Sequence, residues 1–99
     1  MKRYDLTTKD GFKNAASIIA EPPIFWLFRI IFERAVPSHE EQRKTAEELI
    51  KAGKENGVDE MEITISKGVE GKINVPMDDV KIDVGASIGD KVTVKVKYK

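Results

Sequence analysis

The sequence has 99 residues, of which 40% are hydrophobic and 34% are charged, values typical of one soluble globular domain spanning residues 1–99. Its 17 basic and 17 acidic residues give a formal net charge of zero, so no overall positive field favours nucleic acid or an anionic membrane. The chain has no cysteine, which excludes disulfides, thiolate nucleophiles and sulfur-ligated zinc and suits a cytoplasmic location.

Residues 1–14 contain no apolar stretch of the kind that a signal peptide needs. A later apolar stretch runs from Ile24 to Phe32. As a helix it would measure about 13 Å, against about 30 Å for the hydrocarbon core of a bilayer. We therefore do not expect this stretch to span a membrane.

The first predicted helix begins near Thr7 or Thr8 and runs to about Ala20. Asp10 follows Thr7 by three residues, which suits a helix start because an acidic side chain there lies near free backbone N–H groups. The Pro22-Pro23 pair ends the helix, since proline lacks the N–H group and restricts the residue before it.

A second predicted helix runs from Pro23 to about Val36 and is apolar on almost every side. Most of its apolar residues fill one arc of about 180°, which fits a core-facing surface, whereas Trp26 and Ile30 lie outside that arc. Aromatic side chains of this kind are enriched at protein–protein interfaces. We therefore predict an interface formed by Phe25, Trp26, Leu27 and Ile30.

A third predicted helix runs from Ser38 to about Asn56. Ser38 followed by Glu41 is the signature of a capping box, in which each side chain accepts a hydrogen bond from the other residue's backbone N–H. The Asn56-Gly57 pair ends the helix, because both residues accept the left-handed conformation.

From Asp59 onward, apolar and polar residues alternate with the period of a strand that buries one face. The pattern predicts four strands in a meander, with turns near residues 67–71, 76–79 and 89–91. The apolar residues of the four strands are Met61, Ile63 and Ile65; Ile73 and Val75; Val80, Ile82, Val84, Ala86 and Ile88; and Val92, Val94, Val96 and Tyr98.

The register of the last two strands follows from the requirement that an alternating strand keep its apolar residues on one face. This requirement sets Val84 opposite Val96 and Asp83 opposite Lys97. A two-residue turn at Gly89-Asp90 would mix the two faces, so we reject that turn.

The predicted fold class is α+β, with three N-terminal helices (about residues 7–56) packed on one face of a C-terminal four-stranded antiparallel meander sheet (about residues 59–98). No internal repeat or linker divides the chain, and no motif is specific enough to indicate a family.

Candidate catalytic and metal-binding residues are few. His39 is the only histidine, and no nucleophile or orienting partner accompanies it in the sequence. Asp78, Asp79, Asp83 and Asp90 do not follow the spacing of a calcium loop. We therefore predict no enzymatic activity, no catalytic residue, no cofactor and no metal site.

A basic stripe without acidic neighbours is formed by Lys91, Lys95, Lys97 and Lys99 in the last nine residues. With aromatic stacking, such a stripe suits single-stranded nucleic acid. The balanced net charge argues against that partner, and lysines on outer strands commonly prevent edge-to-edge aggregation. Nucleic acid is not an expected partner.

The predicted function is a non-enzymatic small interaction module that self-associates as a homo-oligomer through the aromatic second helix; an unknown protein partner is also compatible with this surface. The alternative is a peripheral membrane-surface protein that docks through the same Ile24–Phe32 helix. Its polar face carries Arg29 and Arg34 offset by Glu33, fewer basic groups than such helices usually have, so self-association is favoured.

Overall fold

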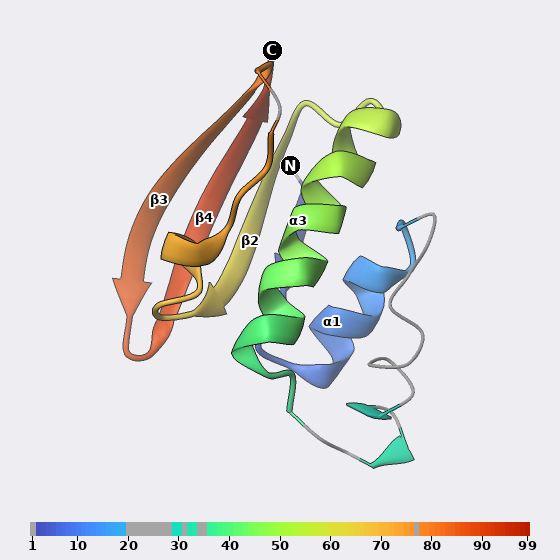
Figure 1. Ribbon diagram of the computed structural model, residues 1–99, viewed down its shortest axis with the longest axis vertical. Helices are drawn as coiled ribbons and strands as arrows, with labels where there is room; N and C mark the ends of the chain where they lie inside the picture. The colour runs from blue at the N-terminus through green and yellow to red at the C-terminus, as the bar shows by residue number, and fades with distance from the viewer. Residues whose placement is uncertain (1, 20–28, 31, 34–35, 77) are drawn as a thin grey trace.

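The computed structural model describes residues 2–19, 29–30, 32–33, 36–76 and 78–99. Its four strands form one mixed sheet in the order β1-β2-β4-β3, and the two α-helices lie beside the sheet (Figure 1). In chain order the elements are β1 (Lys2–Asp5), α1 (Lys9–Ala16), α3 (His39–Glu55), β2 (Glu60–Ser66), the 3-10 helix η1 (Glu70–Lys72), β3 (Val80–Ile88) and β4 (Lys91–Tyr98).

The predicted fold class is wrong in its sheet and in its number of helices. β1 pairs parallel with β2, which places Lys2 opposite Met61, so the sheet is mixed and is not a meander. The described residues form two α-helices rather than three. The predicted helix from Pro23 to Val36 falls mostly outside them, and its described residues Arg29, Ile30 and Phe32 are helical. β1 was not predicted because its sequence KRYD is short, largely charged and shows no apolar alternation.

The predicted strand at Ile73 and Val75 is also absent from the described residues. Both side chains are half-buried against the core, but they lie in the connection between η1 and β3. The intervening Asn74 donates its backbone N–H to the Glu47 carboxylate of α3 at 2.9 Å. The alternation of these two apolar residues therefore reflects packing against the core without a strand ladder.

Helix α1 begins after Thr8, one of the two predicted starts, and ends earlier than predicted. Thr8, not Thr7, is the N-cap residue, and its Oγ1 accepts a hydrogen bond from the Gly11 N–H at 3.1 Å. The Asp5 carboxylate accepts the Thr7 N–H at 2.9 Å and so shapes the turn between β1 and α1. A Cβ atom at Gly11 would lie 1.9 Å from the Asp5 carbonyl oxygen, so this close approach requires glycine.

Helix α3 confirms the predicted capping box. Ser38 Oγ accepts the Glu41 N–H at 3.1 Å, and the Glu41 carboxylate accepts the Ser38 N–H at 2.8 Å. The C-cap is Asn56, and Gly57 follows with a φ of +70°, which confirms the predicted end of this helix.

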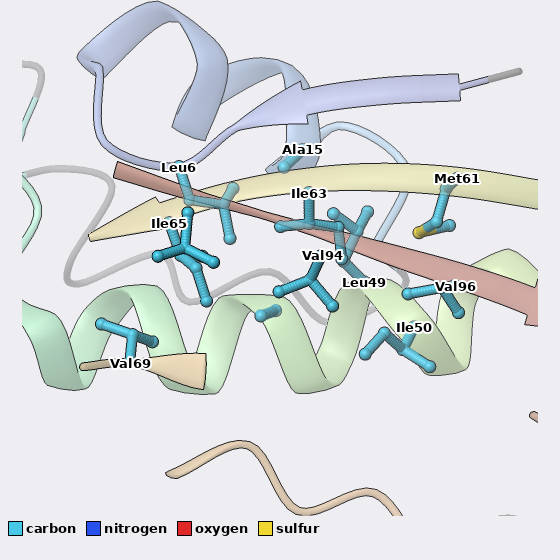
Figure 2. Close-up of a cluster of buried hydrophobic side chains, with 12 residues drawn as sticks. Leu6, Ala15, Leu49, Ile50, Met61, Ile63, Ile65, Val69, Val94 and Val96 are labelled. Carbon is cyan, nitrogen blue, oxygen red and sulfur yellow. The ribbon is translucent and has the colours of Figure 1, made fainter. Parts of the chain in front are cut away.

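The core lies between α3 and one face of the sheet, where side chains of β2 and β4 point toward Leu49 and Ile50 of α3 (Figure 2). We call this face the inner face and the opposite one the outer face. Gly53 of α3 lets the helix approach the sheet, since a Cβ atom there would lie 2.3 Å from the Tyr98 hydroxyl oxygen. The buried inner-face residues are Met61, Ile63 and Ile65 of β2 and Val92, Val94 and Val96 of β4.

The predicted register of β3 against β4 is wrong. The chain turns through the two residues Gly89 and Asp90, which sets Ser87 opposite Val92. Farther along, Val84 lies opposite Val94, not Val96. Asp83 likewise lies opposite Lys95, not Lys97.

A β-bulge explains the difference in register. Between Val84 and Ser87 the pairing shifts by one residue, so β3 carries an extra residue at Gly85-Ala86. The two-residue turn sets inner-face residues opposite outer-face residues only next to the turn. Beyond the bulge, the extra residue brings the inner-face residues of both strands opposite each other again. Gly85 is required there because a Cβ atom would lie 2.9 Å from the Thr93 carbonyl oxygen, and Gly89 adopts a φ of +62° in the turn.

Candidate protein-interaction surface

The interface residues predicted from the sequence lie mostly outside the described residues. This holds for Phe25, Trp26 and Leu27. Ile30 is described and is completely buried, so the chain itself already covers this side chain.

The exposed apolar surface of the described residues is concentrated on β3. Three of the five large apolar side chains exposed there belong to this strand: Ile82, Val84 and Ile88, with exposed fractions of 38%, 59% and 80%. β3 forms one edge of the sheet, on the left in Figure 1, and lies clear of both helices. Every residue from Lys81 to Ile88 is exposed.

The backbone of β3 directs alternate residues toward the free edge. The Lys99 N–H donates to the Asp79 carbonyl oxygen at 2.9 Å, so Asp79 directs its backbone groups toward β4. In an antiparallel pair this direction alternates from residue to residue. Val80, Ile82 and Val84 therefore direct their N–H and C=O groups away from β4, where no strand of the described residues receives them.

The two faces of β3 differ in chemistry. Val80, Ile82 and Val84 share the inner face with the buried residues of β4, because they lie opposite Tyr98, Val96 and Val94. The outer face carries Lys81 and Asp83, whose Nζ and Oδ2 atoms are 3.9 Å apart and whose side chains are both more than half exposed. The edge thus offers apolar side chains on one face and one charge of each sign on the other.

Two lysines of the basic stripe, Lys91 and Lys97, form ion pairs with acidic residues on the outer face. Lys97 Nζ lies 3.6 Å from Glu60 Oε1, and Lys91 Nζ lies 3.6 Å from Asp5 Oδ2. Lys95 lies directly opposite Glu62 of β2. This arrangement is typical of a solvent-exposed sheet face with cross-strand charge pairs.

The candidate catalytic and metal-binding residues are not brought together. His39 is exposed in the first turn of α3, and Asp79 forms an ion pair with Lys54, while Asp78 and Asp90 are exposed. Residues 2–19, 29–30, 32–33, 36–76 and 78–99 contain no group of three or more His, Cys, Asp or Glu residues that could hold a metal ion.

Two buried polar side chains of α3, Glu41 and Gln42, serve the fold. The Glu41 carboxylate is 5% exposed, caps α3 and forms an ion pair with Arg29. On the same helix, Gln42 donates to the Ser66 hydroxyl at 2.9 Å and accepts the Ser66 N–H at 2.8 Å, which joins α3 to the end of β2. These contacts explain the burial of both side chains without a chemical role.

Burial raises the pKa of Tyr98 to about 12, and Tyr4 adds a smaller electrostatic contribution in the same direction. The Tyr98 hydroxyl donates to the Ile50 carbonyl oxygen at 2.6 Å, so the neutral phenol links β4 to α3. On the exposed side of α3, a hydrogen bond from Arg43 lowers the pKa of Glu40. Tyr98 lines a small hollow together with Lys54 and Asp79, but its hydroxyl is used in the hydrogen bond to the Ile50 carbonyl oxygen. Both shifts therefore arise from contacts that hold the fold together.

Sequence reasoning missed the edge surface because strand order is not visible in local alternation. One signal was present: an isolated glycine inside an alternating strand indicates a bulge, and Gly85 has this position. A bulge in turn is common in edge strands. The short, charged β1 offered no comparable signal.

Among the residues that the structure describes, no helix is both apolar and long enough to cross a bilayer. Comparisons with family models, with curated proteins and with solved structures found no match to this chain.

Proposed function

We propose that the chain is a non-enzymatic interaction module that self-associates by adding a strand of a second copy to the free edge of β3. The observation that carries the proposal is the combination, on one strand, of outward backbone groups at Val80, Ile82 and Val84 with exposed apolar side chains. Strand addition satisfies such backbone groups and covers such side chains in one step.

The other edge of the sheet is less suited to this role. β1 has 4 residues, whereas β3 has 9. A short edge strand offers few backbone groups to a partner and is itself a common protection against strand addition. The proposal therefore places the association at β3, and it replaces the aromatic helix as the predicted contact. The cysteine-free sequence suits the cytoplasmic location that we propose for the module.

The test is sedimentation velocity over a wide range of protein concentration. The wild type is expected to form a species with twice the 11.1 kDa mass of one chain as the concentration rises. Ile82→Pro should remove this species, because proline deletes an N–H group that points to the free edge and that β4 does not use.

The matched control is Ile82→Val, which keeps the N–H group and the branched apolar side chain. It should associate like the wild type. Circular dichroism of all three chains checks that the monomer remains folded. A wild type that stays monomeric at the highest concentration, or an Ile82→Pro chain that is folded and still associates, would contradict the proposal.

A further inference from the structure

We infer that the two copies pair antiparallel about a two-fold axis centred on Ile82, with Lys81 of each copy opposite Asp83 of the other. This inference rests on the proposed function, since it assigns a register and a pair of specificity-determining residues to the same edge. The two four-stranded sheets would join into one continuous sheet, with both inner faces on the same side.

The pleat of the sheet restricts the position of the axis. Residues directly opposite each other in an antiparallel pair point to the same face. A two-fold axis between two residues would therefore set an inner-face residue opposite an outer-face one. The axis must pass through a residue, and the regular part of β3 before the bulge, Val80 to Val84, has Lys81, Ile82 and Asp83 at its middle.

The charges of the outer face select among these three residues. An axis on Lys81 would set this lysine opposite its own copy, and an axis on Asp83 would do the same with two carboxylates. Like charges directly opposite each other destabilise a strand pair. An axis on Ile82 instead sets Lys81 opposite Asp83 of the second copy, and the symmetry forms this pair twice.

The backbone supports the same register. With the axis on Ile82, the outward N–H and C=O groups of Ile82 pair with those of Ile82 in the second copy. Those of Val80 pair with those of Val84 in the second copy. Lys81 and Asp83 then form the non-hydrogen-bonded pairs, in which the Cα atoms are only about 4.5 Å apart and side chains approach most closely. The inner face gains apolar contacts while the outer face gains the charge pairs.

Shifts along the strand are less favourable. Toward the C-terminal end, the bulge at Gly85-Ala86 interrupts the ladder. Toward the N-terminal end, an axis on Val80 would set Ile82 opposite Asp78 and Lys81 opposite Asp79, and the Asp79 carboxylate is already paired with Lys54. The bulge and this ion pair thus limit the addition to the five residues from Val80 to Val84.

The decisive experiment uses two single charge reversals and their mixture. Lys81→Glu brings two carboxylates together twice, and Asp83→Lys brings two ammonium groups together twice. Each variant alone should dimerise at least about tenfold more weakly than the wild type, because two favourable cross-strand pairs become repulsive. In an equimolar mixture, the new carboxylate of the Lys81→Glu chain faces the new ammonium group of the Asp83→Lys chain. The unchanged Lys81 and Asp83 of the two chains also face each other. A heterodimer should therefore form with near wild-type affinity.

Lys67→Glu is the matched control, since it makes the same charge change at an exposed residue outside β3 and should leave dimerisation unchanged. A second measurement is independent of charge: a mixture of Lys81→Cys and Asp83→Cys chains should form a disulfide-linked heterodimer faster than either variant alone forms a homodimer. The chain has no other cysteine to compete, and the close spacing of a non-hydrogen-bonded pair suits a disulfide.

The outcomes separate the register from the proposed function. If Ile82→Pro dissociates the wild-type dimer but the charge reversals have no effect and their mixture forms no heterodimer, the register is wrong and strand addition at β3 stands. If the wild type never dimerises, both are wrong. Heterodimer formation by the mixture, together with the preferred cysteine cross-link, supports the register.

Discussion

β4 and β3 are neighbouring strands with the same alternating pattern but very different surroundings. On the inner face of β4, Val94 and Val96 are 1% and 0% exposed, whereas Val84 and Ile82, directly opposite them on β3, are 59% and 38% exposed. Alternation determines which face of a strand is apolar. Whether that face is covered depends on the place of the strand in the sheet, and here α3 covers the centre and leaves the edge open.

The largest effect that we predict comes from comparing the same substitution at two valines, one at the centre of the sheet and one at its edge. Val94→Ala should lower the free energy of unfolding by about 1.5–3 kcal/mol, because it removes buried methyl groups and leaves a cavity. Val84→Ala, on the opposite residue of the same face, should change it by about 0.5 kcal/mol or less. Urea unfolding of dilute, monomeric protein measures both values. Equal losses would mean that the edge is as well covered as the centre.

A second prediction concerns the contact between α3 and the centre of the sheet. Gly53→Ala should cost about 2 kcal/mol, since an overpacking cost near the upper end of the usual range, about 3 kcal/mol, is reduced by about 1 kcal/mol of better helix propensity. The new methyl group would meet the Tyr98 hydroxyl and the Met61 methyl group. Gly71→Ala is the control, because a Cβ atom there has nothing within 4 Å. A neutral Gly53→Ala chain would show that the helix can move away from the sheet at no cost.

Tyr98 provides a smaller test at the end of the same contact. Tyr98→Phe should cost about 0.5–1.5 kcal/mol at neutral pH through loss of the hydrogen bond to the Ile50 carbonyl. Val80, directly opposite Tyr98 on β3, has no side-chain group that could form a hydrogen bond to α3. The measurement is thermal unfolding of the wild type and of Tyr98→Phe. An unchanged midpoint would contradict the prediction.

The same residue gives the stability a dependence on alkaline pH. The pKa of Tyr98 is about 12 in the folded protein and near 10.0 when unperturbed, as in the unfolded chain. The unfolded state therefore loses this proton first, so its contribution to stability is complete below pH 10 and declines as the pH rises toward 12. In Tyr98→Phe this part of the decline should be missing. A wild type whose stability is constant across that interval would disagree with the burial of the phenol.

The smallest effect is expected on the outer face of the edge. Asp83→Ala should lower the stability of the monomer by no more than about 1 kcal/mol, because Asp83 pairs with Lys81 and lies opposite Lys95 on an exposed surface. Urea unfolding of dilute protein at low and high salt is the measurement. A larger or salt-independent loss would mean that this carboxylate is needed for the monomer and not only for association.

The sequence predicts elements whose signals are local. The helix that begins after Ser38 and ends at Asn56 was predicted because its capping box and its C-terminal glycine lie within a few residues of its ends. β2, β3 and β4 were found from alternation alone, while Ile73 and Val75 alternate without forming a strand.

The features that failed depend on distant residues or on irregular backbone. β1 owes its strand conformation to pairing with β2, far along the sequence, and not to the residues KRYD themselves. The register of β3 depends on one extra residue at Gly85-Ala86, which a strict two-residue period cannot represent. The exposed edge follows from the order of the strands, for which Gly85 was only an indirect signal.

The parallel pairing of β1 with β2 also has a consequence for the order of folding. Lys2 meets Met61 only after the intervening chain has folded back, so closing this contact costs more entropy than closing the β3–β4 hairpin. Contacts that are distant in sequence slow folding, and we expect β1 to join last. Until it does, β2 is a temporary edge, and refolding at high protein concentration should lose material to aggregation during that interval.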